Sequence, residues 1–166
     1  MTDGCGRTID YLRLSVTDLC NYRCQYCMPA EGIVKRDHRD MLSIEELAEI
    51  GQAAVRCGVK KIRLTGGEPL VRRGLLELCR LLRAIPELKE LCLTTNGALL
   101  SQLAQPLQEA GVDRLNISLD TLKPERFREI TRRGALEEAL AGIRAAENAG
   151  FRNLKLDTVL IGGFND

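Results

Sequence analysis

The chain has 166 residues, 45% of them hydrophobic, so it is long and apolar enough to fold around one sizeable core. Its 24 basic and 23 acidic residues nearly cancel, and a net charge of +1 gives no electrostatic footprint for nucleic acid or a membrane surface. The N-terminal segment has no long apolar stretch of the kind that marks a signal peptide, and no apolar run reaches the roughly 18 residues of a membrane span. We therefore expect a cytoplasmic protein that binds neither nucleic acid nor membrane.

Strand-like and helix-like segments alternate along the whole chain. Strands are expected at 11–17, 61–65, 90–95, 114–119 and 153–160. Helices are expected at 43–58, which a capping box opens, at 74–85, 102–110 and 135–149, with a short one beginning near Pro124. This alternation predicts a parallel sheet with right-handed crossovers, either part of a barrel or an open doubly wound sheet.

Apolar and polar residues alternate within each expected strand. Most strands of parallel sheets are apolar on both faces, so the pattern is unusual. The polar face would carry Arg13, Arg63 and Lys155, and a dry core cannot hold such cations without partners. We therefore expect a partial (β/α) barrel of about five parallel strands, with helices outside and a polar lumen that binds an anionic ligand. The alternative is a one-sided sheet whose polar face is wet.

Three of the seven cysteines are clustered in a C-x3-C-x2-C spacing: Cys20, Cys24 and Cys27. They follow the first expected strand, on a loop at the end of the sheet where α/β barrels gather catalytic groups. Three thiolates can hold three irons of a cubane and leave the fourth iron open. The alternative is a structural zinc site, which would need a fourth ligand such as His38. The scattered cysteines are expected to be free thiols: Cys5, Cys57, Cys79 and Cys92.

The triad, with an aromatic residue before its last cysteine, resembles the radical S-adenosylmethionine (SAM) superfamily. In that superfamily SAM chelates the open iron, and an electron from the cluster yields a 5'-deoxyadenosyl radical. Further segments narrow the resemblance: 11–18, 28–29, 62–69, 94–97, 116–120 and 127–134. Together they resemble the GTP 3',8-cyclase family of molybdenum cofactor biosynthesis, also called molybdenum cofactor biosynthesis protein A, over nearly the whole chain.

The resemblance implies a lyase that converts GTP to 3',8-cyclo-7,8-dihydro-GTP, with the SAM-derived radical rather than a side chain abstracting the hydrogen. It implies a [4Fe-4S] cluster on Cys20, Cys24 and Cys27. SAM contacts would fall on Tyr26, Gly67 and Ser118, and GTP contacts on Arg13, Arg63, Thr94 and Lys155. The implied partners are a reductase or other electron donor and a downstream pterin-forming enzyme, and a homodimer is left open. Four other arginines are expected to be solvated: Arg72, Arg73, Arg132 and Arg133.

The chain departs from the family's pattern by being shorter. We expect residues 1–166 to be a radical SAM core domain truncated after strand five, without the C-terminal domain whose cysteines hold a second cluster and GTP. Such a piece would bind the first cluster and SAM but complete little cyclisation. The rival interpretations are another radical SAM enzyme, such as a peptide maturase, and a non-catalytic zinc or interaction domain.

Overall fold

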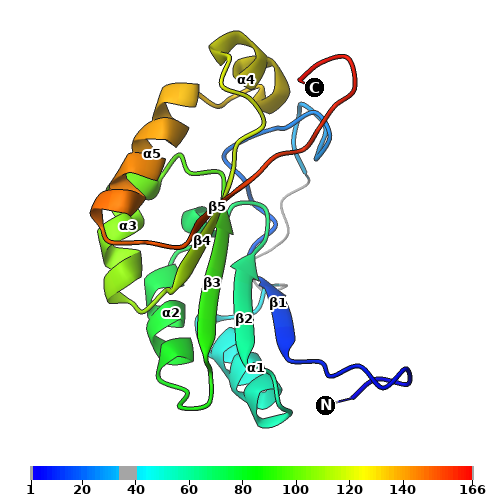
Figure 1. Ribbon diagram of the computed structural model, residues 1–166, viewed down its shortest axis with the longest axis vertical. Helices are drawn as coiled ribbons and strands as arrows, with labels where there is room; N and C mark the ends of the chain where they lie inside the picture. Colours follow the sequence, from blue (N-terminus) through cyan, green and yellow to red (C-terminus); the bar gives the residue numbers. More distant parts are fainter. Residues whose placement is uncertain (1, 34–40, 166) are drawn as a thin grey trace.

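A computed structural model describes residues 2–33 and 41–165, so His38 lies outside the described residues. Its centre is one parallel sheet with the strand order β1-β2-β3-β4-β5 (Figure 1). The strands are β1 (Tyr11–Ser15), β2 (Lys61–Thr65), β3 (Glu90–Thr95), β4 (Arg114–Ser118) and β5 (Leu154–Asp157). A doubly wound sheet reverses its strand order at a switch point, whereas this order runs straight through, as in a barrel.

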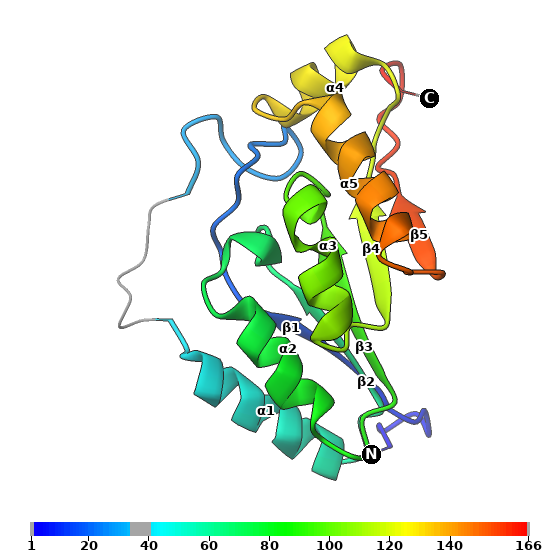
Figure 2. The same cartoon turned by 90° about the vertical axis from the view of Figure 1, so that its left-hand side faces the viewer.

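The helices cover one face of the sheet and, with one of them, the carboxyl ends of its strands. They are α1 (Ile44–Arg56), α2 (Leu75–Arg83), α3 (Leu100–Glu109), α4 (Pro124–Thr131) and α5 (Leu136–Asn148), with a 3-10 turn, η2 (Pro69–Val71). Figure 2 shows α1, α2, α3 and α5 in front of the strands, and α4 beyond the carboxyl ends of the strands. The predicted partial barrel with its helices outside is thereby confirmed. Among the described residues, no helix has the length and apolarity that crossing a membrane requires.

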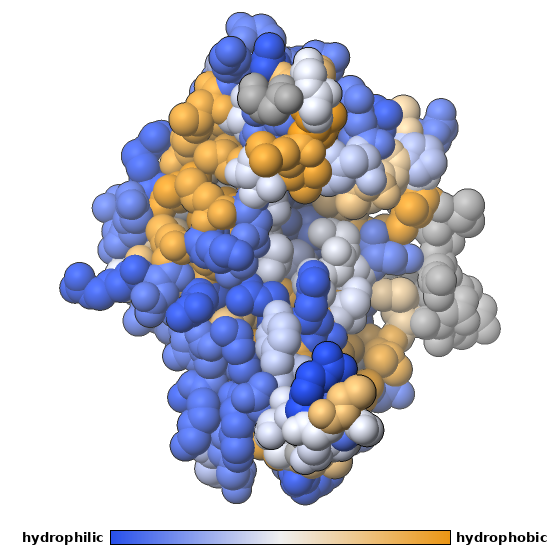
Figure 3. Space-filling view, turned by 45° about the vertical axis from the view of Figure 1, so that its right-hand side comes forward, coloured by the Kyte–Doolittle hydropathy of each residue, from blue (hydrophilic) through white to orange (hydrophobic). Residues whose placement is uncertain are grey.

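Alternation along the strands separates a buried face from a polar one, as the sequence predicts. The apolar face packs under the helices and includes Leu14, Ile62, Leu64, Leu91, Leu93, Leu115 and Ile117. Each such side chain contributes roughly 1.5–3 kcal/mol when fully buried. Figure 3, which brings the uncovered side of the sheet forward, shows hydrophilic and neutral residues over the middle of this side. The sheet is therefore held from its helical side and leaves its polar face available for a ligand.

The expected ends of three strands were wrong. β4 stops at Ser118, one residue before the expected end, whereas in β1 and β5 the chain turns away earlier to contact a neighbouring loop. β1 stops at Ser15, and the carbonyl of Thr17 then accepts a hydrogen bond of 2.8 Å from the Gly67 amide. β5 stops at Asp157, and the Thr158 hydroxyl then donates to the Leu119 carbonyl at 2.8 Å. Tertiary contacts thus shorten strands that the local pattern would have continued.

Local signals at helix ends were more reliable. The Ser43 hydroxyl accepts from the Glu46 amide at 3.1 Å, and the Glu46 carboxylate accepts from the Ser43 amide at 2.7 Å, so the capping box is confirmed. Pro124 begins α4. α3 begins earlier than expected, at Leu100, and contains Pro106 inside it.

Candidate functional site

The loop that carries the three cysteines, which we call the cysteine loop (residues 18–28), begins where β1 ends. Its start runs directly beside the turn after β2, since the Glu68 amide donates to the Leu19 carbonyl at 2.8 Å. A Cβ atom at Gly67 would lie 2.3 Å from the Leu19 carbonyl oxygen, and one at Gly66 would lie 2.3 Å from that of Thr17. Both glycines are therefore needed for two backbones to approach, whatever ligand also lies near them.

A small second core anchors the middle of the cysteine loop. Tyr22 is buried there, and its ring meets that of Phe127 edge to face, with the ring centroids 6.1 Å apart. The other buried members are Leu119, Leu136 and Ala139. Cys20 and Cys24 pack against this cluster. Apolar contacts to this cluster, to which Cys20 and Cys24 contribute, therefore hold the loop, while Cys27 is exposed.

A buried carboxylate joins the turn after β2 to the end of β3. Glu68, 1% exposed, accepts from the Leu70 amide at 3.0 Å, the Thr95 hydroxyl at 2.7 Å and the Asn96 amide at 2.7 Å. Burial raises the pKa of Glu68, and the three donors oppose that rise. The Asn96 side-chain amide then donates to the Asn21 side-chain oxygen at 2.8 Å. A hydrogen-bonded path thus runs from Glu68 to the residue beside Cys20.

The three cysteine side chains are free thiols, and they lie close enough together to interact electrostatically. Cys20 and Cys24 are half-buried and Cys27 is exposed. Burial, with smaller contributions from the Cys20 and Cys27 thiols, raises the pKa of Cys24 to about 11. Burial also raises the pKa of Cys20, with a smaller contribution from Cys27. Each pair within the triad therefore lies within electrostatic reach.

The donor set fits an iron–sulfur cluster. Within residues 2–33 and 41–165, no three Cys, His, Asp or Glu side chains are arranged to hold one metal ion. Ligands of a single zinc lie about 2.3 Å from the same atom. Cubane ligands bind separate irons, so their sulfurs stand farther apart. Three free thiols on one anchored loop, each able to bind a separate iron, are the donor set of a cubane with one open iron.

The polar face of the sheet begins beside this loop and carries the residues predicted to bind GTP. Arg63 is nearly buried there, and its guanidinium donates to the Tyr11 hydroxyl at 2.9 Å and to the Thr94 hydroxyl at 3.3 Å. Arg13 stands opposite Arg63 in the register of β1 and β2 and is exposed. Neither arginine forms an ion pair with a carboxylate in the part of the chain that the structure describes, although Arg63 lies within electrostatic reach of Asp157. This pair of cations is suited to an anionic ligand.

Lys155 lies farther across the same face and is engaged differently. Its ammonium forms an ion pair of 2.8 Å with Asp157, and Asn116 donates to the same carboxylate at 2.7 Å. Burial raises the pKa of Asp157, but the bonds from Lys155 and Asn116 outweigh it and hold the pKa below its usual range. Asn116 stands in register between Thr94 and Lys155, so three neighbouring strands contribute to this row.

The predicted SAM residues come from three segments at the same edge of the sheet. Gly67 follows β2, Ser118 ends β4, and Tyr26 lies on the cysteine loop. The Tyr26 hydroxyl donates to the Asp120 carboxylate at 2.7 Å, just beyond Ser118. Their arrangement matches a ligand that would lie across the carboxyl ends of the strands.

Sequence reasoning missed the residues that hold the cysteine loop in place: Asn21, Glu68, Asn96 and Asp120. Two of them carried a signal. Asn96 and Asp120 continue the polar side of the alternation in β3 and β4, two residues after the predicted ligand residues Thr94 and Ser118. Arg132 is exposed, as expected, but its guanidinium also donates to two carbonyls of the loop, a role that the sequence did not predict. Arg72, also expected to be solvated, is partly buried and donates to the Leu42 carbonyl at 2.6 Å.

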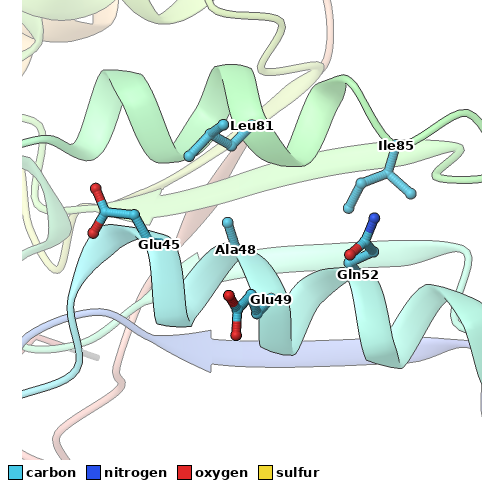
Figure 4. A pocket seen from close by; sticks show the side chains of 6 residues that line it. All are labelled: Glu45, Ala48, Glu49, Gln52, Leu81 and Ile85. Carbon is cyan, nitrogen blue, oxygen red and sulfur yellow. The ribbon is translucent and has the colours of Figure 1, made fainter.

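A groove of about 280 Å³ lies elsewhere, on the outside of the helical layer between α1 and α2. Figure 4 shows Ala48, Leu81 and Ile85 in it, with the carboxylates of Glu45 and Glu49 nearby. Those carboxylates disfavour a phosphate-bearing ligand, and the groove opens on the covered side of the sheet. It therefore has no part in the site built around the cysteine loop.

Curated relatives and a family pattern agree with this geometry. Residues 14–166 match the Radical SAM superfamily. The chain is 57% identical over all 166 residues to a GTP 3',8-cyclase of Peptoclostridium acidaminophilum, of which it covers 51%. It is 55% identical over 166 residues to a GTP 3',8-cyclase of Geobacter sulfurreducens, again covering 51%. The chain thus spans about half the length of the curated relatives it matches.

Solved structures share the fold at low sequence identity. The [FeFe]-hydrogenase maturase HydG matches with a TM-score of 0.73 at 14% identity, over 90% of this chain and 34% of that one. Methylornithine synthase (PylB) matches with a TM-score of 0.70 at 18% identity, over 93% of this chain and 45% of that one. Streptococcus suis SuiB bound to S-adenosylmethionine matches with a TM-score of 0.68 at 18% identity, over 90% of this chain and 32% of that one. With its matched sequence, its barrel-type sheet and its three thiols at the carboxyl edge, this chain belongs to the radical SAM superfamily.

Proposed function

We propose that this chain is the cluster- and SAM-binding part of a GTP 3',8-cyclase. The observation that carries the proposal is the position of the three mutually interacting thiols, at the edge of a polar sheet face that presents Arg13 and Arg63. The relatives named GTP 3',8-cyclase support the choice of substrate, because they align with the chain from end to end. Low-identity structural neighbours support only the fold.

In this proposal Cys20, Cys24 and Cys27 hold a [4Fe-4S] cluster. Such a cluster, with SAM bound, would supply the radical chemistry that removes the ribose 3' hydrogen of GTP. The protein's own part is to position the ligands and to limit access of water. Tyr26, Gly67 and Ser118 would contact SAM from the loop and from the ends of β2 and β4.

Four side chains on the polar face would orient GTP: Arg13, Arg63, Thr94 and Lys155. The Arg63 guanidinium is already fixed between two hydroxyls, so little conformational entropy would be lost when it meets a phosphate or a guanine acceptor. On binding GTP, Lys155 would either leave its ion pair with Asp157 or contact Asp157 and the ligand together. These contacts favour an anionic nucleotide over a neutral peptide.

We further propose that residues 1–166 form the core domain of a longer enzyme and complete little cyclisation alone. The relatives are about twice as long, and beyond the one triad the remaining cysteines of this chain are scattered. The whole enzyme would act in the cytoplasm, draw on an electron donor, pass its product to a pterin-forming enzyme, and could assemble as a homodimer.

Anaerobic reconstitution with iron and sulfide tests the proposal. We expect about four irons per chain, an EPR signal that changes when SAM is added, and uncoupled SAM cleavage that falls when GTP is added. Cys20→Ala should lose iron, while Cys5→Ala, at an exposed cysteine outside the triad, should retain it. One zinc per chain would contradict the cluster, and SAM cleavage indifferent to GTP would favour another radical SAM reaction.

A further inference from the structure

The end of α4 and the cysteine loop complete each other's hydrogen bonds. The last four carbonyls of a helix have no partner within it. In α4, the Arg132 amide takes the first of them, at Arg128. The loop takes the other three: the Arg23 amide donates to Thr131 at 3.0 Å, the Gln25 amide to Ile130 at 2.9 Å, and the Gln25 side chain to Glu129 at 2.8 Å. The loop therefore serves as the cap of this helix.

The Arg132 side chain makes the opposite connection, from the helix end to the loop. Its Nη1 donates to the Arg23 carbonyl at 2.8 Å and to the Met28 carbonyl at 2.9 Å. These two carbonyls lie on either side of the segment that contains Cys24 and Cys27. One guanidinium thus fixes both ends of the segment that holds two of the three thiols.

The backbone of Arg132 supports a specific role for this side chain. Its φ is +60°, and it is the only non-glycine residue with positive φ in the described ranges. A helix commonly ends with glycine in this conformation, because a Cβ atom is strained there. An arginine at a position where glycine is easier suggests that its side chain is needed.

The contact with the cysteine loop is specific to Arg132 and is not shared by the next arginine in the chain. Arg132 and Arg133 are both exposed, but Arg133 makes none of the described side-chain hydrogen bonds or ion pairs. Only one of the two adjacent arginines is directed at the cysteine loop.

We propose that Arg132 is a positioning residue for the cluster: its guanidinium holds the backbone on both sides of Cys24 and Cys27, so that the thiols are preorganised for iron. The role in cluster binding rests on the proposed function, whereas the clamp on the loop exists without any cluster. Groups that orient metal ligands in this way commonly change metal affinity 10–100-fold when removed, and we expect an effect of about that order here.

Arg132→Gly separates this role from that of a helix cap. Glycine removes the guanidinium but relieves the strained backbone, so the urea midpoint of the apo chain should stay equal or rise. Amide hydrogen exchange at Arg23 and Gln25 should nevertheless become about tenfold faster. After reconstitution, the variant should lose iron faster than wild type and show a broadened EPR signal.

Two further variants sharpen the test. Arg132→Lys keeps a donor that can reach a carbonyl, so it should recover part of the exchange protection and of the iron retention. Arg133→Ala should behave like wild type in all three measurements. Wild-type exchange and iron retention in Arg132→Gly would overturn the proposal and reduce Arg132 to a helix cap. If the wild-type chain takes up no iron, the proposed function fails, and the exchange rates then decide the clamp alone.

Discussion

The Tyr26 hydroxyl donates a hydrogen bond of 2.7 Å to the Asp120 carboxylate, across 94 residues of sequence. The other carboxylate oxygen accepts from the Val159 amide at 2.9 Å. Asp120 thus joins the cysteine loop, the end of β4 and the segment after β5. Burial raises the pKa of Tyr26, and the bond to Asp120 raises it further, so the phenol stays protonated and remains the donor.

Removing either partner of this bond should loosen the cysteine loop in the apo chain. Tyr26→Phe deletes the donor, and Asp120→Ala deletes the acceptor without adding a new donor. Urea unfolding of both single variants and of the double variant gives the coupling free energy, which we expect to be about 1 kcal/mol. Strictly additive effects would show that the bond contributes nothing measurable.

Gly67→Ala should destabilise the apo chain by about 2 kcal/mol, because the added methyl group would meet the Leu19 carbonyl and push the cysteine loop away. Gly162→Ala is the matched control, since a Cβ atom there meets nothing within 4 Å. Urea midpoints of the two variants make the comparison. Equal stability of the two would show that the loops can separate at no cost.

The raised pKa of Cys24 predicts a pH dependence of stability. The ordinary thiol value is 9.0 and the folded value is about 11, so between them the unfolded chain loses a proton that the folded chain keeps. This contribution to stability is full below pH 9.0 and is lost as the pH rises toward 11. Urea unfolding of the apo chain across this window should show a loss on the order of 1 kcal/mol that Cys24→Ser lacks.

The rate of alkylation of Cys24 gives an independent check that folding raises the pKa of this thiol. The rate follows the thiolate, so its midpoint should lie near pH 11 in the folded apo chain and near 9.0 in urea. A native midpoint at or below the denatured one would contradict the effect of burial. The same raised value means that iron binding must release protons, so cluster assembly should be favoured by higher pH.

Arg63→Ala should weaken binding of GTP to the cluster-loaded chain by about tenfold to a hundredfold, since it removes a preorganised cation from the polar face. The affinity of Arg63→Lys for GTP should lie between those of wild type and Arg63→Ala, because lysine keeps the charge but lacks the planar guanidinium. Arg144→Ala, an exposed arginine on α5 in the helical layer, is the control. Calorimetric titration measures all three, and unchanged affinity in Arg63→Ala would exclude Arg63 from the GTP site.

Much of the fold could be predicted because its signals are local. The alternation of Leu12 and Leu14 with Arg13 assigns the faces of β1 without any tertiary information, since successive strand residues point to opposite sides. The same period placed Arg63, Thr94 and Lys155 on the polar face. The ends of β1 and β5 were not predictable in this way, because loops from other strands decide where they stop.

By itself the sequence determined the three-thiol spacing, the order of strands and helices, and the polar face, all of which depend on residues close together in the chain. Only the tertiary structure decided how the cysteine loop is held: by Asn96 through Asn21, 75 residues apart, and by Arg132 through the Arg23 carbonyl, 109 residues apart. Such partners are set by the closing of the sheet and the docking of α4. No local pattern specifies which distant group will arrive at an unpaired backbone carbonyl.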